Sequence, residues 1–422
     1  MTADPTAAGK ALAAACSVVR EGDSGEAVDG IVPLFVASPG DTAEASALLR
    51  AAAEHDLAVV PRGSGSRLGW GAPAARCDLV VDTLRMDSVI EHAAGDLVAR
   101  VQAGARMNHV LGLLAAAGQE IALDVPGTAT AGGVVASGLC GPRRLRYGSP
   151  RDLLIGITIV RADGTVAKSG GKVVKNVAGY DLGKLFAGSA GTLGLITEAT
   201  FRLHPLPAAR AFVSTTFPLG EAAANVAAAV AAAANSPQVA SAVELSRQAP
   251  GGPVSVGVLL EGSADGVAAR AARMAGLIGS GAAEVSAEPP AWWPAAIEPD
   301  GGTLIRVSFW VSALGQVLDT IDAAARASRI APLVYGSAGA GVLYIACRAE
   351  PAVAGFVSAL RTALSGARGG VVVVAAPAPV RSALAEDGGM AGAVPSLSLM
   401  RAVKDQFDPG HRMAPGRFPE GI

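Results

Sequence analysis

Short apolar runs alternate with helical stretches over the first half of the chain. Residues 41–54 (DTAEASALLRAAAE) begin with an acidic residue and carry apolar residues at helical spacing, so they predict a helix. Gly118 ends a second predicted helix, and the Asp163–Gly164 turn joins two runs into a predicted β-hairpin. The strands predicted in this half are 57–60, 79–82, 98–101, 153–160 and 165–168, and the second helix is 107–117.

The pattern changes after the HPLP stretch at residues 204–207. Long alanine-rich helices now alternate with strands, and no glycine-rich loop separates them, which predicts a separate α+β domain. The predicted helices are 220–234, 264–278, 317–328 and 352–365, and the predicted strands are 254–260, 303–311, 341–347 and 370–376. Residues 397–407 predict one more helix, followed by a tail rich in proline and glycine.

Length and composition favour a soluble protein of two domains. A chain of 422 residues exceeds the usual size of one hydrophobic core. The mean hydropathy is +0.41, but alanine supplies much of it, and no stretch approaches the ~20 apolar residues that span a bilayer. The net charge is -2, there is no basic tract, and aromatic residues make up 4%, so nucleic-acid binding is not expected.

The cysteines point to a reducing compartment. Cys16, Cys77, Cys140 and Cys347 stand far apart, without a C-x-x-C pair, which excludes most iron–sulfur and structural zinc signatures. Residues 10–16 (KALAAAC) resemble the end of a lipoprotein signal. However, Asp4 precedes them, and the apolar run is shorter than the apolar region of a signal peptide. We interpret them as an amphipathic first helix and expect a cytoplasmic protein without a metal site.

The loop at residues 61–71 (PRGSGSRLGWG) follows a predicted strand and contains four glycines. Glycines let successive N–H groups converge on an anion such as a pyrophosphate, and the serines and arginines add donors. A Rossmann fingerprint would require a third glycine where Leu68 stands, and a helix directly after the loop. Pro73 and a strand follow instead, which argues against a nicotinamide-dinucleotide fold, and taken alone the loop is equally compatible with a plain turn.

Two more glycine-rich segments follow. Residues 126–148 (PGTATAGGVVASGLCGPRRLRYG) are dominated by small residues, so that the backbone can approach a flat ligand closely. Residues 170–197 contain NVAGYDL and a turn of small residues at 188–194.

The order of these motifs resembles the FAD-binding domain of the vanillyl-alcohol-oxidase-like (PCMH-type) flavoproteins. RGSGS, TAGGVVAS, GPRRLRYGSPRD, NVAGYDL and GTLGLITEATFRLHPLP occur in the order found in D-lactate dehydrogenases and glycolate oxidase subunits, and are especially similar to the smaller glycolate oxidase flavoprotein. The resemblance implies an α+β fold: an FAD domain of two α/β subdomains at 1–207, a smaller α+β cap domain at 208–395, and a segment at 396–422 that returns to the FAD domain.

The resemblance also implies which residues bind the cofactor. Backbone amides of the first loop would hold the FAD pyrophosphate, the second segment would line the flavin and phosphates, and the third would approach through main-chain contacts. The implied residues are Arg62, Gly63, Ser64, Gly65, Ser66, Arg67, Gly127, Thr128, Thr130, Gly132, Gly133, Ser137, Tyr147, Gly191, Thr192 and Ile196. The family more often has asparagine where Ala414 stands, so a side-chain contact there is not expected.

The flavin is expected to be non-covalent, because residues 62–71 contain no histidine or cysteine for attachment and only Cys140 lies nearby. His109, His204 and the Trp292–Trp293 pair are interpreted as structural residues. Arg143, Arg144 and Arg146 bind a phosphate or partner, or simply lie in solvent. Arg306, on a predicted strand, is a candidate to clamp a carboxylate.

Relatives that oxidise 2-hydroxy acids by themselves carry histidine–glutamate motifs in the second domain, whereas no histidine occurs here between residues 208 and 410. The preferred hypothesis is therefore the FAD-binding subunit of a multi-subunit glycolate oxidase, which converts glycolate to glyoxylate. Its partners would be a larger flavoprotein and an iron–sulfur subunit, through which it would lie at the inner face of the membrane. The alternatives are a stand-alone FAD-dependent 2-hydroxy-acid dehydrogenase and a structural subunit of the assembly. No catalytic residue is assigned.

Overall fold

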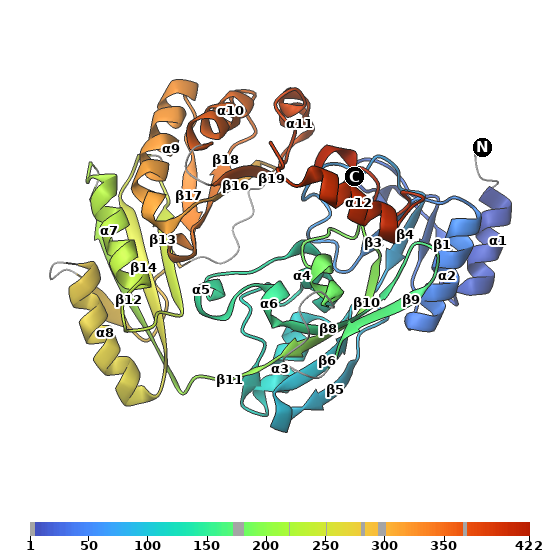
Figure 1. The fold of residues 1–422 in the computed structure, drawn as a ribbon, viewed down its shortest axis with the longest axis horizontal. Coiled ribbons are helices and arrows are strands. Elements are labelled where there is room, and N and C mark those ends of the chain that lie inside the picture. The colour runs from blue at the N-terminus through green and yellow to red at the C-terminus, as the bar shows by residue number, and fades with distance from the viewer. Residues whose placement is uncertain are drawn as a thin grey trace. The chain divides into compact units, whose positions relative to one another are not determined.

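The computed structural model describes residues 5–171, 181–218, 220–249, 251–279, 283–293, 301–365 and 369–422. The chain divides into two compact units, which are described separately. The first unit contains Met1–Cys140, Ser149–Leu206 and Val394–Ile422, and the second contains Gly141–Gly148 and Pro207–Ala393. Both units combine sheets with packed helices, which confirms the predicted α+β class (Figure 1).

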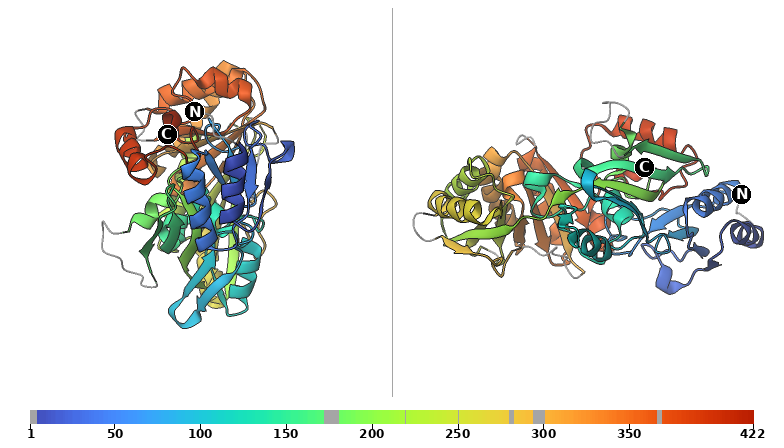
Figure 2. Two further views of the ribbon diagram at one scale, coloured as in Figure 1. Left: turned by 90° about the vertical axis from the view of Figure 1, so that its right-hand side faces the viewer. Right: turned by 90° about the horizontal axis from the view of Figure 1, so that it is seen from below.

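The first sheet of the first unit has four strands in the order β1-β2-β4-β3. Strands β2, β4 and β3 are parallel, and β1 is antiparallel to β2. Helices α1 and α2 lie side by side (Figure 2) and bury Leu12, Leu48 and Leu49 in the core of this sheet. The elements are α1 (Pro5–Ala15), β1 (Val19–Glu21), β2 (Phe35–Ala37), α2 (Thr42–Glu54), β3 (Val59–Arg62) and β4 (Leu79–Asp82).

Helix α2 confirms the predicted helix at 41–54. The Asp41 side chain caps it by accepting a hydrogen bond of 2.8 Å from the Glu44 amide. Strand β3 runs two residues later than predicted and includes Pro61, a residue that β3 tolerates because it is the edge strand of its sheet. The strand therefore delivers the chain directly into the glycine-rich loop.

The second sheet is antiparallel, in the order β5-β6-β10-β8-β9. The predicted hairpin is confirmed as β8 and β9, and every residue of β8 is buried. Helices α3 and α4 pack on this sheet. The elements are β5 (Val89–Ala93), β6 (Val98–Gln102), α3 (Met107–Ala115), β7 (Gln119–Glu120), α4 (Ala131–Ser137), α6 (Pro150–Leu153), β8 (Leu154–Val160), β9 (Val166–Gly170), β10 (Leu195–Arg202) and β11 (His204–Pro205).

Helix α12 (Leu397–Phe407) and the residues after it belong to the first unit. The chain beyond α12 runs beside β3, where the Val59 amide donates to the Arg412 carbonyl and the Ala414 amide donates to the Val59 carbonyl, both at 2.8 Å. The chain after α12 thus forms an isolated bridge with the outer edge of β3.

The second unit is one eight-stranded sheet in the order β15-β12-β14-β13-β17-β18-β16-β19. Helices α7, α8, α9 and α10 cover one of its faces (Figure 1) and build its apolar core. The elements are α5 (Arg144–Tyr147), β12 (Ala209–Phe217), α7 (Ala223–Ala234), β13 (Ala242–Arg247), β14 (Val254–Gly262), α8 (Ala264–Ile278), β15 (Glu284–Ser286), β16 (Thr303–Ser308), α9 (Leu314–Ser328), β17 (Leu333–Gly336), β18 (Val342–Cys347), α10 (Ala352–Leu364), β19 (Gly370–Ala375) and α11 (Ala378–Leu384).

One boundary differs from the expected domain layout. Residues 141–148 were expected within a first domain of 1–207, yet they pack with the second unit. Leu145 contacts the core of that unit, and the side chains of Arg143 and Tyr147 bond to Glu261 of β14. The physical reason is the buried Glu261 carboxylate, which requires cationic and hydroxyl partners.

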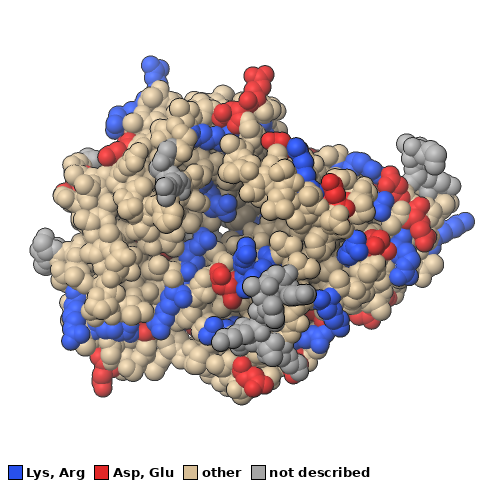
Figure 3. All heavy atoms as spheres, viewed as in Figure 1, with Lys and Arg blue, Asp and Glu red and all other residues tan. Residues whose placement is uncertain are grey.

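Lys, Arg, Asp and Glu side chains are interspersed on the face shown in Figure 3, and uncharged residues cover most of it. None of the helices within the described ranges is long and apolar enough to cross a membrane.

Candidate cofactor-binding site

The first glycine-rich loop begins at an anchored arginine. The Arg62 side chain bonds to Glu26 and donates from Nη2 to Asp82 Oδ2 at 2.8 Å. The hydrogen bond from Arg62 is the main cause that lowers the pKa of Glu26, with a smaller contribution from Arg20. Its guanidinium is engaged by two carboxylates and its carbonyl accepts from the Thr83 amide at 2.9 Å, so Arg62 fixes the start of the loop.

The next four residues present amides without partners. Within the described part of the chain, the N–H groups of Gly63, Ser64, Gly65 and Ser66 donate no hydrogen bond. Gly65 has a φ of +77°, a backbone conformation that glycine adopts without strain. Successive N–H groups without partners in a glycine-rich turn suit a phosphate or pyrophosphate, because each amide would gain an acceptor. The loop therefore fits an anionic cofactor.

The far end of the loop is also fixed. The Arg67 guanidinium lies 4.5 Å from the centroid of the Trp70 ring. Arg417 donates to the carbonyls of Leu68 and Trp70, the latter at 2.9 Å, and pairs with Asp29 at 2.9 Å. The tail thus holds the loop from residue 68 onward.

The second segment touches the first loop directly. A Cβ on Gly63 would lie 2.1 Å from Thr130 Oγ1, so no other residue fits there without a shift. Thr130 caps α4, and its Oγ1 accepts from the Gly133 amide at 3.3 Å. Ser137 donates to the Gly133 carbonyl at 2.7 Å. The side chains of Thr130 and Ser137 therefore shape this segment.

The remaining members of this segment precede α4. Gly127 accepts from the Asn108 amide at 3.0 Å, and the Thr128 carbonyl accepts from Arg106 at 3.3 Å. These bonds hold the approach to α4 against α3. Gly132 packs closely against Ala103.

The third segment docks on the other two. The amides of Gly188 and Ala190 donate to the carbonyls of Val135 and Ala136 at 2.9 and 2.8 Å. Gly191 has a φ of +79°, and a Cβ there would lie 3.2 Å from Pro61. Residues 61–71, 126–140 and 181–197 of the three segments therefore converge within the first unit, as a single cofactor would require.

The side chains of Thr192 and Ile196 are buried. The buried Thr192 hydroxyl donates to the Ser189 carbonyl at 2.7 Å, and Ile196 lies in the apolar core under the sheet. Contact with a ligand at Thr192 would be through the main chain. The NVAGYDL motif falls largely on residues 172–180, which lie outside the described residues.

A buried lysine, which the sequence did not single out, supports this third segment. Lys404 of α12 is fully buried and donates to the Thr192 carbonyl at 2.7 Å, the Met413 carbonyl at 2.9 Å and Asp408 at 2.7 Å. Burial lowers its pKa, and Asp408 opposes that effect. Its i,i+4 spacing to Asp408 resembles an ordinary surface ion pair, so the sequence carries no sign of the burial.

Tyr147 is held by the second unit. Its hydroxyl donates to Glu261 Oε2 at 3.1 Å, while Arg143 and Arg210 approach Glu261 Oε1 at 3.4 and 3.0 Å. Burial raises the pKa of Tyr147, and the Glu261 charge adds to the rise. The implied cofactor contact of Tyr147 remains an expectation, and its observed role is to anchor α5.

The carboxylate-clamp candidate, Arg306, lies on the sheet face opposite the helices. Its side chain is exposed, its core neighbours Ile305 and Val307 point to the helical face, and its strand partner is Tyr344. On the same face Glu244 is buried, and Ser337 donates to it at 2.5 Å.

The remaining candidates have structural surroundings. Trp293 packs edge-on against Phe212 with centroids 5.1 Å apart, and Trp292 lies against Gly257. His109 is exposed on α3. Burial raises the pKa of the Cys77 and Cys347 thiols to about 12. Among the described residues, no group of three His, Cys, Asp or Glu side chains could hold a metal ion.

Comparison with known proteins finds one family model and several relatives similar to the first part of the chain. Residues 33–170 match the family model of an FAD binding domain. Glycolate oxidase subunit GlcD of Bacillus subtilis is 38% identical over 178 residues, which cover 42% of this chain and 38% of that protein. Glycolate oxidase subunit GlcE of Escherichia coli is 36% identical over 172 residues, covering 40% of this chain and 49% of that protein.

A third relative, a D-lactate dehydrogenase of Archaeoglobus fulgidus, is 36% identical over 198 residues, covering 45% of this chain and 43% of that protein. The matches thus span less than half the length of these relatives. A solved structure of an alkyldihydroxyacetonephosphate synthase aligns with 91% of this chain and 76% of its own, with a TM-score of 0.66 at 15% identity. This likeness concerns the fold alone.

Proposed function

From the premise that residues 33–170 form an FAD-binding domain of the PCMH type and that FAD is its cofactor, we propose that this chain is the FAD-binding subunit of a multi-subunit glycolate oxidase. The convergence of three glycine-rich segments around four unpartnered amides carries the proposal. Its similarity to two glycolate oxidase subunits supports the choice among flavoprotein functions.

The residues of the first unit fit FAD. The amides of residues 63–66 would hold the pyrophosphate, the backbone around residues 127–133 would lie along the flavin, and the turn at 191–192 would approach through its main chain. When bound, the flavin can accept two electrons from an organic substrate. The contribution of this chain is to bind and orient it.

Among the described residues, the machinery for oxidising the substrate is incomplete. A 2-hydroxy acid requires a base at its hydroxyl and a cation at its carboxylate. Arg306 is exposed and could serve the carboxylate. However, the Glu261 carboxylate is occupied by two arginines and a tyrosine, and Glu244 is buried against Ser337.

Electron transfer away from the flavin would need partner proteins. The four cysteines are far apart in the sequence, and Cys16, Cys77 and Cys347 are buried thiols. An iron–sulfur subunit would accept the electrons, and a larger flavoprotein would oxidise glycolate to glyoxylate.

A second candidate is a stand-alone FAD-dependent 2-hydroxy-acid dehydrogenase. The similarity to a D-lactate dehydrogenase and the exposed Arg306 favour it. It requires the chain alone to turn over a 2-hydroxy acid.

The test is an affinity pull-down of the full chain from native cells, with flavin, iron and partner polypeptides assayed in the product. We expect a second flavoprotein and an iron-containing protein to co-purify and the complex to reduce a dye with glycolate. Gly65→Asp should reduce the flavin content of the complex, and Gly118→Asp should leave it unchanged. A yellow chain without partners would favour the stand-alone dehydrogenase, and a colourless chain within the complex would favour a structural subunit.

A further inference from the structure

Residues 141–148, which include α5, leave the first unit and return to it. The chain up to Cys140 and the chain from Ser149 belong to the first unit, whereas residues 141–148 pack with the second. Gly138, Leu139 and Cys140 are the three residues that separate them from α4, the helix of the second glycine-rich segment. Contacts that hold residues 141–148 in place therefore also hold the chain directly after α4.

Glu261 of β14 anchors these residues through a buried carboxylate, and its side chain is 1% exposed. Arg143 approaches its Oε1 at 3.4 Å, and the Tyr147 hydroxyl donates to its Oε2 at 3.1 Å. Leu145, which lies between them in the sequence, packs against the apolar core of the second unit. Arg210 of β12 also donates to Oε1, at 3.0 Å, but comes from the sheet. Because a buried carboxylate depends on cationic and hydroxyl partners, Glu261 binds α5 firmly.

Helix α4 depends on what holds its two ends. It has seven residues, two of which are glycines, and so short a helix with such residues is marginal by itself. The Thr130 side chain caps its first turn. At its other end the Gly138 amide donates to the Val135 carbonyl, and the chain then enters the residues that Glu261 anchors. The anchor therefore limits fraying of the last turn of α4.

The last turn of α4 also receives the third glycine-rich segment. The Gly188 amide donates to the Val135 carbonyl at 2.9 Å. The Ala190 amide donates to the Ala136 carbonyl at 2.8 Å. Fraying of this turn would remove both acceptors and leave the turn at 188–194 without their support. The cofactor would then have to order two segments as it binds, which lowers its affinity.

We propose that Glu261 is a positioning residue for FAD. By holding α5 it keeps the end of α4 ordered, so that cofactor binding in the first unit is coupled to the second unit through the chain itself. Linkage makes the coupling reciprocal: FAD stabilises the anchored state of α5 by the same factor by which that state favours FAD. This coupling depends on FAD as the cofactor and is independent of the glycolate oxidase assignment.

The first test is fluorescence titration of the full-length apo-protein with FAD. Glu261→Gln and Arg143→Gln should each weaken FAD binding about tenfold, a size usual for couplings between sites. Thermal unfolding checks that each variant is folded, and Arg143→Gln tests the same link should Glu261→Gln fail to fold. The wild-type affinity tests the cofactor, whereas the ratio of variant to wild type tests the coupling. Unchanged affinity in folded Arg143→Gln would overturn the proposal.

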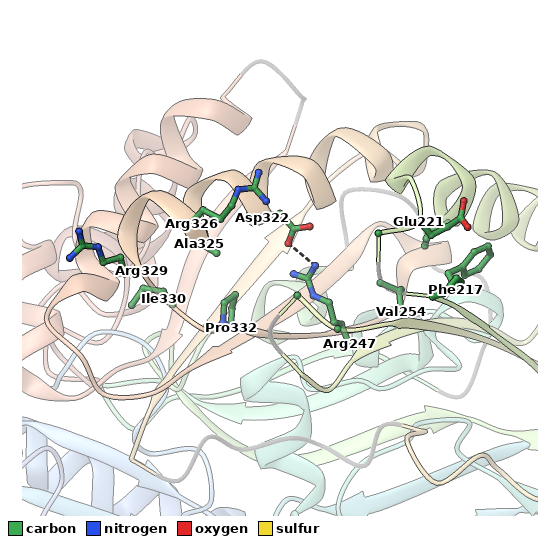
Figure 4. A pocket seen from close by; sticks show the side chains of 15 residues that line it. Phe217, Glu221, Arg247, Val254, Asp322, Ala325, Arg326, Arg329, Ile330 and Pro332 are labelled. Atoms are coloured by element: carbon green, nitrogen blue, oxygen red, sulfur yellow. Dashed lines mark hydrogen bonds and ion pairs between the residues drawn. The ribbon is translucent and has the colours of Figure 1, made fainter.

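Two controls separate the anchor from general destabilisation of the second unit. Asp322 of α9 accepts from Nη1 of the buried Arg247 at 2.6 Å, beside a cavity of about 440 Å³ in the same unit (Figure 4). Asp322→Asn, like Glu261→Gln, takes a carboxylate from an arginine, but this pair is not part of the anchor. Arg210→Gln removes a partner of Glu261 that is not in residues 141–148. Both should leave FAD affinity unchanged, and a loss equal to that of Glu261→Gln would refute the coupling.

Hydrogen exchange gives a readout that a purely structural role of Glu261 would not change. The amides of Arg146, Tyr147 and Gly148 are bonded within residues 141–148. In the wild type, saturating FAD should slow their exchange about tenfold, because the coupling is reciprocal. In FAD-saturated Glu261→Gln the slowing should be lost. Equal slowing in both proteins would show that α5 responds to the cofactor without Glu261, and no slowing in the wild type would exclude the coupling.

Discussion

Gly63 and Gly65 are two positions of the first loop where a side chain is not tolerated. At Gly63 a Cβ would collide with the Thr130 side chain, which joins the first and second segments. At Gly65 the space is open, with Arg62 Cδ the nearest atom at 3.7 Å, but the φ of +77° strains any other residue. Loss of flavin through Gly65 would therefore follow from strain and charge at the amides rather than from a steric clash.

We expect Gly65→Asp to lower FAD affinity by about 100-fold or more, because a carboxylate would stand beside amides that face a pyrophosphate. Gly118→Asp is the matched control: its φ is +68°, nothing lies within 4 Å of its Cβ, and it lies outside the three segments. Fluorescence titration of apo-protein with FAD measures both. Equal losses of FAD affinity in the two variants would show that strain, and not the loop, is responsible.

Glu26 should make the anchoring of Arg62 pH-dependent. Its folded pKa lies below its ordinary value of 4.5, chiefly through the hydrogen bond from Arg62. The resulting stability is present above pH 4.5 and is lost as the pH falls through the lowered pKa. Glu26→Gln should therefore be less stable than the wild type at pH 7, with a difference that shrinks in acid. Urea unfolding between pH 3 and 7 tests this, and a constant difference would contradict it.

At the scale of elements, α12 and the tail support the cofactor segments from outside them. Lys404 connects α12 to the Thr192 carbonyl, Arg417 binds the end of the first loop, and the Arg412 and Ala414 backbone pairs with Val59. Docking of the tail and order in the loops should therefore be coupled.

Lys404→Met should destabilise the fold by about 3–5 kcal/mol, because it leaves Asp408 as an uncompensated buried charge. It should also weaken FAD binding by loosening the turn at 191–192. The double variant Lys404→Met/Asp408→Asn should recover part of the stability, and Arg401→Met, on the exposed side of the same helix, should change little. Denaturant unfolding and FAD titration measure both effects. A single variant as stable as the wild type would contradict the role assigned to this pair.

The elements that sequence predicted best had local signals. Helix α2 has its Asp41 cap, and α8 and α12 match the predicted ranges 264–278 and 397–407 because helical periodicity continues to their ends. Helix α4 was missed because Gly132 and Gly133 lower helix propensity; in the structure the Thr130 cap and the close packing of Gly132 against Ala103 support it. Strand β13 was missed although Val243 and Leu245 alternate with polar residues, and all of its residues are buried.

The same distinction, between local sequence signals and contacts of distant residues, applies to the cofactor-binding site. The order of small residues predicted the three segments, and the structure brings them together. Contacts between residues far apart in the chain could not be predicted: 118 residues separate Arg143 from Glu261, and 212 separate Lys404 from Thr192. The assignment of residues 141–148 to the first domain failed for that reason.

At the scale of the whole molecule, the chain offers more residues suited to cofactor binding than to substrate chemistry. The first unit brings parts of three glycine-rich segments together, whereas the second offers Arg306 but no histidine between residues 208 and 410. This contrast is why we propose a cofactor-binding subunit rather than a complete dehydrogenase.

Accordingly, the isolated chain should oxidise glycolate or lactate at less than roughly 1 per second, below ordinary enzyme rates. Activity should appear on co-expression with the larger flavoprotein and the iron–sulfur subunit. Dye reduction by the purified chain with saturating FAD and a panel of 2-hydroxy acids measures it. Faster turnover by the chain alone would support the stand-alone dehydrogenase instead.

The most direct test of the account is the state of the flavin in the purified chain. Residues 62–71 contain no histidine or cysteine, and the loop offers amides rather than a nucleophile, so the cofactor should be held without a covalent bond. Acid precipitation should release about one FAD per chain into the supernatant, identified by its mass and fluorescence. Yellow flavin that stays with the precipitate, or a chain that binds no FAD when saturated with it, would contradict the central claim.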